Sequence, residues 1–451
     1  GLAIDWVSEC GCTGIEIESV GLTAYLWHAG FHNLRINKCT DDNPRCLGQP
    51  ERLSTALKAL ESNRRDEEIE MPDVVVVHVA YLGVCGVPEQ YERYVRCRSL
   101  ADPDHKQASR RGKGSGRGCR RPFMIARAMG EEDRIGSDDV ENCNTFYDQV
   151  WVPSTFHRTA FTKSGVEASK VHVVPEIVDF EAFDPSRVPG DFSFWAADSP
   201  VTVTFLSVFK WEDRKNWRQL LRAFMYMFAF RPSVGLFIKT STYMGADPDG
   251  ESMEFMESVL EDIVRTTDEF GASQDQILNY PHEVVLESLE QAWVTDPADP
   301  RCILNRIKTA YSRMPSNEMP KLYKAADAFV LPSHGEGWGL PLMEAMAMEL
   351  PTIGTKFGGN VDFMDPSCSF LLDAKRVRTA MGAGHWGQPS NEQLMTHMNW
   401  VVHNQNAAQE LGKRARRHLL EHFSPGSVTR IMEAKLQDIG DRVISGSVKT
   451  G

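Results

Sequence analysis

The chain has 451 residues, of which 42% are hydrophobic and 25% charged, and its formal net charge is −13 at pH 7. This length predicts two domains of about 200 residues each, and the composition is that of a globular protein. The negative charge argues against generic nucleic-acid binding, because most of the surface would repel a polyanion.

The ten cysteines are scattered, and only Cys10 and Cys12 lie close together. We expect most of them to be free thiols in a reducing compartment, which favours the cytoplasm. No apolar run approaches the roughly 18–20 residues that span a bilayer, and we recognise no signal peptide. Peripheral contact with a membrane is compatible with this pattern.

The first half of the chain alternates between predicted strands and helices. Residues 6–30 indicate a strand, a turn containing Gly11 and Gly14, and an amphipathic helix. The valine-rich segment 74–79 is typical of a parallel strand covered on both faces. Further strands are predicted at 122–129, 149–154 and 170–176. A strand, a helix and a strand at this spacing predict a parallel α/β sheet.

Two segments interrupt this pattern. Residues 93–121 are rich in Arg, Lys, Gly and Ser and predict a disordered basic insertion, either a solvated loop or a functional arm. Residues 183–200 hold three prolines and no periodic pattern, as in an interdomain linker. We therefore predict domains at 1–185 and 201–425, a linker at 186–200, and a final helix at 426–451 that packs back on the first domain.

The second half repeats the α/β pattern. Strands are predicted at 201–209, 234–241, 328–333 and 351–355, and Ser390 with Gln393 indicates a capping box. A helix beginning at Asn216 has one apolar face. This face consists of Leu220, Leu221, Phe224, Met225 and Phe228.

A glycine-rich loop follows the strand at 328–333. It contains Gly335, Gly337 and Gly339, and Pro341 then falls in the first turn of a predicted helix, where its missing N–H is harmless. Such a junction directs backbone N–H groups and the positive end of a helix dipole toward the carboxyl edge of a parallel sheet. The loop therefore predicts an anion site suited to a diphosphate.

Two glutamates frame this loop. Glu336 lies in the loop and Glu344 in the second turn of the helix, with seven residues between them. Their carboxylates are suited to accept hydrogen bonds from sugar and ribose hydroxyls. The alternative is that a helix amino terminus simply favours acidic residues.

The run EGWGLPLMEAMA, residues 336–347, resembles glycosyltransferase family 4, the retaining enzymes of the GT-B fold. The resemblance extends to the segments 323–333, 358–364 and 205–224, and to 148–185 in the first half. It implies an α/β chain with two Rossmann-like domains whose parallel sheets face each other across a cleft. It also implies transfer of a hexosyl unit, with retention, from a UDP- or GDP-linked sugar to a glycan, lipid or other hydroxyl acceptor.

The resemblance assigns donor-site roles to the second half. Glu336 would lie near the transferred sugar, and Glu344 would hold the ribose. The family places an Arg and a Lys on the diphosphate. Lys215 matches the Lys, whereas Phe209 stands at the Arg position. The catalytic candidates are therefore Glu336, Lys215 and Lys210, and the remaining donor-side candidates are Glu344, Gly335, Gly337, Trp338, Gly339, Leu340, Arg214 and Gly14.

Several of these assignments have a structural alternative. Lys210 and Arg214 are the two candidates to replace the missing Arg, or else they belong to a solvated helix start. Trp338 either contacts the donor or packs beneath the loop. Lys239, at the end of a strand, is either a donor contact or a plain exposed lysine.

On the acceptor side, Glu131 stands where many relatives have a cleft-facing His, and His78 follows the valine-rich strand. Their alternatives are a surface carboxylate and a satisfied core histidine. We recognise no metal site and expect no cofactor, because lysines and a helix terminus would stabilise the leaving diphosphate.

Two other classes of function compete with this assignment. A catalytically inactive nucleotide-sugar-binding or scaffold protein is the main alternative, and Phe209 at the usual Arg position favours it. A phosphorylase-like enzyme would need a lysine-bound cofactor site, which the sequence does not indicate.

Overall fold

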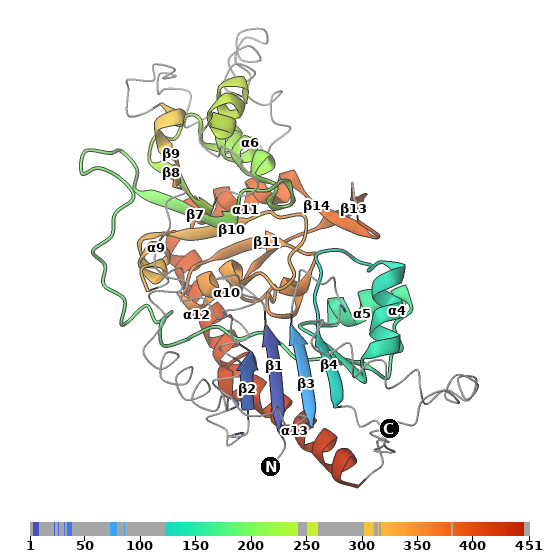
Figure 1. Cartoon of the computed structure of the whole chain (residues 1–451). Coiled ribbons are helices and arrows are strands. Elements are labelled where there is room, and N and C mark those ends of the chain that lie inside the picture. Colours follow the sequence, from blue (N-terminus) through green and yellow to red (C-terminus); the bar gives the residue numbers. More distant parts are fainter. Residues whose placement is uncertain are drawn as a thin grey trace. The chain divides into compact units, whose positions relative to one another are not determined.

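The structure is a computed structural model that describes residues 3–8, 22, 26, 31, 34–37, 73–78, 85, 122–241, 250–259, 302–310, 314, 317–379 and 382–445. The chain forms two compact units (Figure 1). The first comprises Gly1–Asp179, Arg378–His385 and Glu421–Gly451, and the second comprises Phe180–Val377 and Trp386–Leu420. The predicted insertion at 93–121 lies outside the described residues.

The predicted linker at 186–200 groups with the second unit, which begins at Phe180 rather than at residue 201. Its aromatic side chains explain this difference. Phe194 packs on Phe237 with ring centroids 4.6 Å apart, and Trp195 Nε1 donates to Thr204 Oγ1 at 2.9 Å. The segment is therefore anchored to the second sheet rather than free to act as a spacer.

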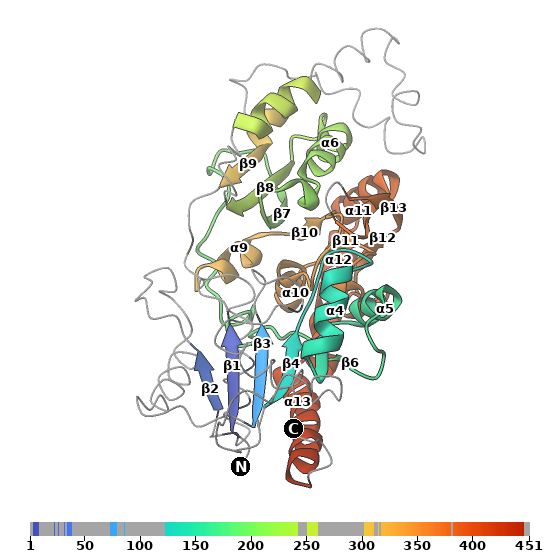
Figure 2. The same ribbon diagram turned by 45° about the vertical axis from the view of Figure 1, so that its right-hand side comes forward.

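The first unit is built on a six-stranded parallel sheet in the order β2-β1-β3-β4-β5-β6. Figure 2 shows β2, β1, β3 and β4 side by side with their arrows in one direction. The strands are β1 (Ile4–Ser8), β2 (Leu34–Asn37), β3 (Val74–His78), β4 (Phe123–Arg127), β5 (Gln149–Val152) and β6 (Val171–Val173).

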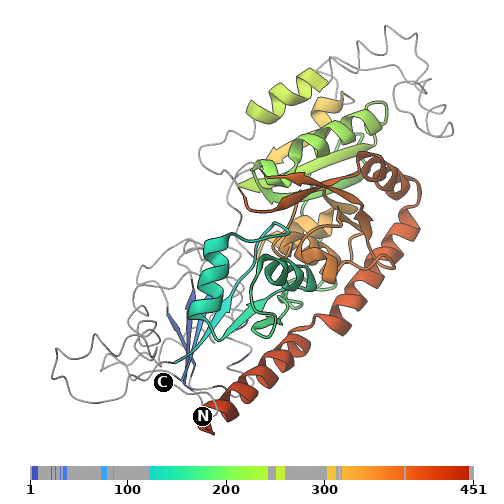
Figure 3. The same ribbon diagram turned by 90° about the vertical axis from the view of Figure 1, so that its right-hand side faces the viewer.

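The valines of β3 supply both faces of this sheet, as the sequence predicts. Val75 and Val77 pack in the core formed with α4 (Ser137–Phe146) and α5 (Thr155–Ser164). Val74 and Val76 pack in a second core with α13 (Pro425–Ile444), which runs beside the strands in Figure 3. From α13, this core receives Val428, Met432, Leu436 and Ile439.

The second unit has its own six-stranded parallel sheet, in the order β12-β11-β10-β7-β8-β9. The strands are β7 (Val203–Lys210), β8 (Val234–Ser241), β9 (Ile307–Ala310), β10 (Ala328–Leu331), β11 (Thr352–Thr355) and β12 (Phe370–Leu372). A two-stranded sheet joins β13 (Ala374–Arg378) to β14 (His385–Pro389). Its helices include α6 (Trp217–Phe228), α9 (Met319–Ala325), α10 (Leu340–Ala347), α11 (Asn391–His403) and α12 (Gln405–His422), and residues 250–259 are also helical. Three short turns are η3 (Asp213–Lys215), η5 (Ile303–Arg306) and η6 (Gly359–Asp362).

Helix α6 has the apolar face that the sequence predicts, since Leu220, Leu221, Phe224, Met225 and Phe228 are all buried. The predicted cap of α11 is also present, because Ser390 Oγ accepts the Gln393 N–H at 3.3 Å. Among the described helices, none combines the length and the apolar content needed to cross a membrane.

An aspartate precedes three of the strands and ties each to its neighbour by a reciprocal pair of bonds. The carboxylates of Asp73, Asp148 and Asp327 accept the N–H groups of Ala3, Met124 and Thr204 at 2.8–2.9 Å. The N–H groups of the same aspartates donate back to the carbonyl oxygens of those residues at 2.8–3.0 Å. This device fixes strand register at the amino edge of both sheets.

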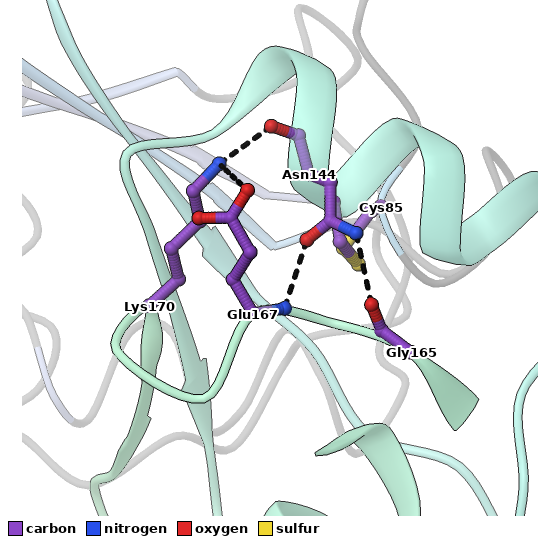
Figure 4. Close-up of a disulfide and its surroundings, with 6 residues drawn as sticks. Cys85, Asn144, Gly165, Glu167 and Lys170 are labelled. Atoms are coloured by element: carbon purple, nitrogen blue, oxygen red, sulfur yellow. Dashed lines mark hydrogen bonds and ion pairs between the residues drawn. A yellow bond between two sulfur atoms is a disulfide. The ribbon is translucent and has the colours of Figure 1, made fainter. Parts of the chain in front are cut away.

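A disulfide joins Cys85 to Cys143 in α4, across 58 positions of sequence. This pair is an exception to the expectation that most cysteines are free thiols, whereas Cys302 and Cys368 are free and buried. Next to the disulfide, Asn144 accepts the Glu167 N–H at 2.9 Å and donates to the Gly165 carbonyl oxygen at 3.0 Å (Figure 4). The end of α4 is thus held both covalently and by hydrogen bonds.

Candidate donor site in the second unit

The glycine-rich loop connects β10 to α10. Gly339 caps the start of the helix with φ 93°, a left-handed backbone conformation that residues other than glycine rarely adopt. Pro341 lies in the first turn. No described side chain caps the amino end of α10. Pro341 has no N–H, and the N–H groups of Leu342 and Met343 donate to the Gly339 carbonyl oxygen at 2.9 and 3.1 Å. The first turn therefore offers an anion the Leu340 N–H and the positive end of the helix dipole.

A pair of glycines holds the loop from one side. The Gly359 N–H donates to the Glu336 carbonyl oxygen at 2.8 Å, and Gly358, with φ 110°, bridges to Glu336 as a short parallel ladder. A Cβ on Gly359 would lie 2.0 Å from the Gly337 carbonyl oxygen. Only glycine permits this approach, so the segment GGN is a structural requirement for the position of Glu336.

Lys215, the last residue of η3, faces Glu336 from the opposite side. Its Nζ lies 2.8 Å from both carboxylate oxygens of Glu336, and the two residues are 7% and 5% exposed. Arg214 Nη1 lies 3.7 Å from Glu336 Oε1. The structure thus brings together Lys215, Glu336 and Arg214, all three of which the sequence predicts for the donor site.

Burial and charge act in opposite directions on this cluster. Burial alone would raise the pKa of Glu336, but the charges of Lys215 and Arg214, with hydrogen bonds from Lys215 and Ser333, hold it below its usual value. Burial lowers the pKa of Lys215, and Glu336 opposes that shift. Because two cations face one acid, we assign Glu336 as the ionised carboxylate at neutral pH.

Arg214 also supports the backbone of the loop. Its guanidinium donates to the Gly335 carbonyl oxygen at 2.7 Å and pairs with Glu212 at 2.6 Å. Its own carbonyl oxygen accepts the His334 N–H at 2.7 Å. Of the two candidates to replace the missing Arg, Arg214 is therefore the one that the structure places beside Glu336.

Phe209 and Lys210, the last two residues of β7, differ in their exposure to solvent. Lys210 is exposed. Phe209 is buried and stacks on Trp211 at 5.9 Å, and Trp211 stacks on Trp217 at 4.5 Å. The position where the resemblance predicts an arginine is thus part of an aromatic stack in this chain.

Glu344 lies on α10, four residues after the start of the helix, and is partly buried. It accepts a hydrogen bond from the Tyr323 hydroxyl at 2.6 Å. Burial raises the pKa of Glu344 to about 7, and the bond from Tyr323 lowers it by a smaller amount. Sequence reasoning missed Tyr323, because nothing in its local pattern marks a partner 21 residues away.

Three other residues in or next to the loop make packing contacts or lie at the start of α10. Trp338 is 3% exposed, packs on Phe363 at 4.9 Å and donates to Met343 Sδ at 3.2 Å, which fits the packing alternative. Leu340 is the first residue of α10 and is partly buried. Sequence reasoning also missed His334, whose ring lies parallel to that of Trp386 at 5.5 Å.

Lys239 in β8 is buried rather than exposed, so the alternative of a plain exposed lysine is wrong. Its Nζ donates to the carbonyl oxygens of Thr240 and Ala310 at 3.0 and 3.5 Å. Burial lowers its pKa. The side chain is alkyl-rich and sits among β-strand residues, which explains its inward position.

The acceptor-side candidates belong to the first unit. Glu131 follows β4 and is partly buried, while its neighbour Glu132 accepts the Gly384 N–H at 2.7 Å. His78 ends β3, and its side chain lies outside the described residues, as does Gly14. The roles of all three candidates stay predictions. Within the described ranges, no group of three or more His, Cys, Asp or Glu is arranged to hold a metal ion.

The chain is similar to known glycosyltransferases. Residues 304–418 match the family model described as glycosyl transferases group 1. Sulfoquinovosyl transferase SQD2 of Arabidopsis thaliana is 25% identical over 119 residues, which cover 26% of this chain and 21% of that protein. D-inositol 3-phosphate glycosyltransferase of Segniliparus rotundus is 39% identical over 67 residues, 15% of either chain. The chain thus matches less than a quarter of the length of each curated relative.

The crystal structure of HepE from Anabaena in complex with UDP and glucose superposes with a TM-score of 0.57 at 12% identity. The match covers 97% of this chain and 100% of that one. The chain has the GT-B fold. The predicted fold class, α/β with two Rossmann-like parallel sheets, is therefore confirmed.

Proposed function

We propose that the chain is a glycosyltransferase of the group 1 type, related to family 4. It would transfer a hexosyl unit from a UDP- or GDP-linked sugar to a hydroxyl acceptor, with retention. The observation that carries this proposal is the buried Lys215–Glu336 pair, at 2.8 Å, beside the uncapped amino end of α10. Glu336 lies inside the residues that match the group 1 family model.

The cluster supports departure of a diphosphate. Lys215, Arg214 and the positive end of the α10 dipole supply positive charge where the leaving group develops negative charge. A diphosphate there competes with Glu336 for the same two cations. The oxygens of Glu336 that Lys215 now occupies then become acceptors for hydroxyls of the transferred sugar.

Glu344 is assigned to the ribose. Its carboxylate already accepts one hydroxyl, that of Tyr323, at 2.6 Å. Ribose hydroxyls present the same chemistry as the tyrosine hydroxyl, so they can share or replace this bond. Two cations and a helix terminus neutralise the diphosphate in this scheme, and we therefore propose turnover without a divalent ion or cofactor. The rate should be unchanged by EDTA.

The test measures release of UDP or GDP from UDP-glucose and GDP-mannose, with the anomeric configuration of the product determined by NMR. Replacing Arg214 and Lys210 separately by Ala compares the two candidate cations. Arg214→Ala should lower kcat by about 100-fold, as for loss of one charge-stabilising donor. Lys210→Ala, a change of the same type five residues from Lys215, should leave kcat nearly unchanged. An inverted product, or equal losses in both variants, would contradict the mechanism.

A non-catalytic nucleotide-sugar-binding protein is the second candidate. Phe209 favours it, because this side chain is 5% exposed and stacks on Trp211, so the position presents no cation. Thermal shift with UDP and GDP separates the two candidates. Stabilisation by a nucleotide without turnover of any donor supports the binding protein, and turnover supports the enzyme.

A further inference from the structure

A hollow of about 1000 Å³ lies in the second unit, between α6, β13 and the start of α11. We call it the α6–α11 hollow. Its lining includes Arg218, Gln219, Arg222, Asp373, Lys375 and Gln388. Neither Lys215 nor Glu336 belongs to this lining. The hollow is therefore a separate place from the proposed donor site.

Three cations, Arg218, Arg222 and Lys375, and two acids, Asp373 and Glu392, line the hollow. Arg218 also pairs with Asp213 at 2.6 Å, so Arg222 and Lys375 are the cations left for a ligand. Arg218 and Arg222 stand one turn apart on α6 and share one side of the helix. Arg222 lies over the ring of Phe255 at 5.6 Å. Neither Arg222 nor Lys375 forms an ion pair within the part of the chain that the structure describes. Both therefore keep charge and donors for an anionic group.

The rest of the lining suits hydroxyl groups. Asp373 and Glu392 supply carboxylate acceptors, and Gln219 and Gln388 supply amides with both donors and acceptors. Phe255, Ala374 and Pro389 add apolar surface, against which the carbon face of a sugar ring can pack. Cations together with hydroxyl-binding groups match one chemistry, a small sugar or polyol that carries a phosphate.

Two hydrogen-bonded paths lead from the hollow to the donor loop. Gln219 Oε1 accepts from Asn216 Nδ2 at 2.6 Å, and the same Nδ2 donates to the Pro332 carbonyl oxygen at 3.0 Å. Gln219 Oε1 also accepts from Gln388 Nε2 at 2.5 Å.

Gln388 follows Gly387, whose N–H donates to the His334 carbonyl oxygen at 2.7 Å. Pro332 and His334 stand on either side of Ser333, just before Gly335 and Glu336. A ligand that moves the Gln219–Gln388 pair therefore acts on both supports of the loop.

We propose that the α6–α11 hollow binds a small phosphorylated sugar or polyol and that its occupancy changes the affinity of the donor loop for the nucleotide. Binding in the hollow stands independently of the proposed function, whereas its effect on the nucleotide rests on that function. Coupling of this kind is reciprocal, so the nucleotide must change the affinity of the hollow by the same factor.

The experiment titrates the full chain with glucose 6-phosphate by calorimetry, with glucose and inorganic phosphate as separate arms. We expect saturable binding of glucose 6-phosphate, and weaker binding of either fragment. Arg222→Ala and Lys375→Ala should each weaken it about tenfold or more, as for loss of a charge-assisted bond. Arg430→Ala, an exposed arginine on α13 of the other unit, is the matched control and should not weaken it.

A Lys215→Ala variant separates the two sites, because it removes the proposed diphosphate contact and leaves the hollow intact. Binding of glucose 6-phosphate that persists in Lys215→Ala supports the hollow even if no donor is ever turned over. Binding lost in Lys215→Ala but unchanged in Arg222→Ala overturns the proposal. So does the absence of saturable binding, or phosphate alone binding as tightly as glucose 6-phosphate. An unchanged affinity for UDP at saturating glucose 6-phosphate overturns the coupling.

Discussion

Glu344→Gln should make the second unit more stable above neutral pH. The side chain of Glu344 is partly buried beside Tyr323, and burial raises the pKa of its carboxyl from 4.5 to about 7. Holding the charged form in this place costs free energy that a neutral amide does not. Gln has nearly the same shape, and its Oε1 can still accept the Tyr323 hydroxyl bond, which measures 2.6 Å in the native chain.

The raised pKa of Glu344 makes its contribution to stability fall as the pH rises. A carboxyl whose pKa is higher in the folded state binds its proton more tightly there, so its stabilising contribution is complete below pH 4.5 and is lost as the pH rises through about 7. A shift of about 2.5 units corresponds to about 3 kcal/mol at 1.36 kcal/mol per unit. Because the Glu344 side chain is partly exposed, this value is an upper limit.

The assay is thermal unfolding of wild type and Glu344→Gln between pH 4 and pH 8. For a domain of roughly 200 residues, 1 kcal/mol shifts Tm by about 2–4 °C. The Tm values should coincide near pH 4 and separate in favour of the variant, by up to roughly 10 °C, near pH 8. A constant difference across this range, or a variant that is less stable at pH 8, would refute the reasoning.

Three further changes test other contacts. Lys215→Met leaves the buried Glu336 carboxylate with one cation fewer and should lower the free energy of unfolding by about 3–5 kcal/mol in denaturant titrations. Gly359→Ala should cost about 1–3 kcal/mol, because the new Cβ would lie 2.0 Å from a carbonyl oxygen, whereas Gly426→Ala meets nothing within 4 Å. Cys143→Ser should destabilise the first unit by about 2–4 kcal/mol through loss of the disulfide.

Each change has an outcome that contradicts it. A Lys215→Met protein as stable as wild type would mean that the pair is not buried in solution. Equal stability of the two alanine variants would remove the argument from close approach at the GGN segment. If a reductant lowers the stability of Cys143→Ser as much as that of the wild type, the crosslink is not the cause.

Most of the fold is predictable from patterns of residues that are close together in the sequence. The valines of β3, the apolar face of α6 and the loop before Pro341 are each decided by residues within one or two turns of each other. The core strands were therefore placed from sequence, as was the serine cap of α11. The short strands β9, β12, β13 and β14 were not, because their segments lack a clear alternating pattern.

The site was less predictable because its contacts are long-range. Lys215 and Glu336 are 121 positions apart, and only the family resemblance placed both in one site. No local signal decides between Lys210 and Arg214, since Lys210 ends β7 and Arg214 lies in η3, and the choice depends on where each element directs its side chain. The inward position of Lys239 depends on the neighbouring strand β9, which the sequence did not reveal.

The aspartates before β3, β5 and β10 separate two roles within each sheet. Strand alignment is settled where the strands start, by carboxylates that bond the main chain of a neighbour. The opposite ends, where β7 finishes at Phe209 and Lys210, carry no such duty. Because Phe209 pairs with Thr240 through the main chain, a different side chain at this position would leave the pairing of β7 in place while changing what the end of the strand presents.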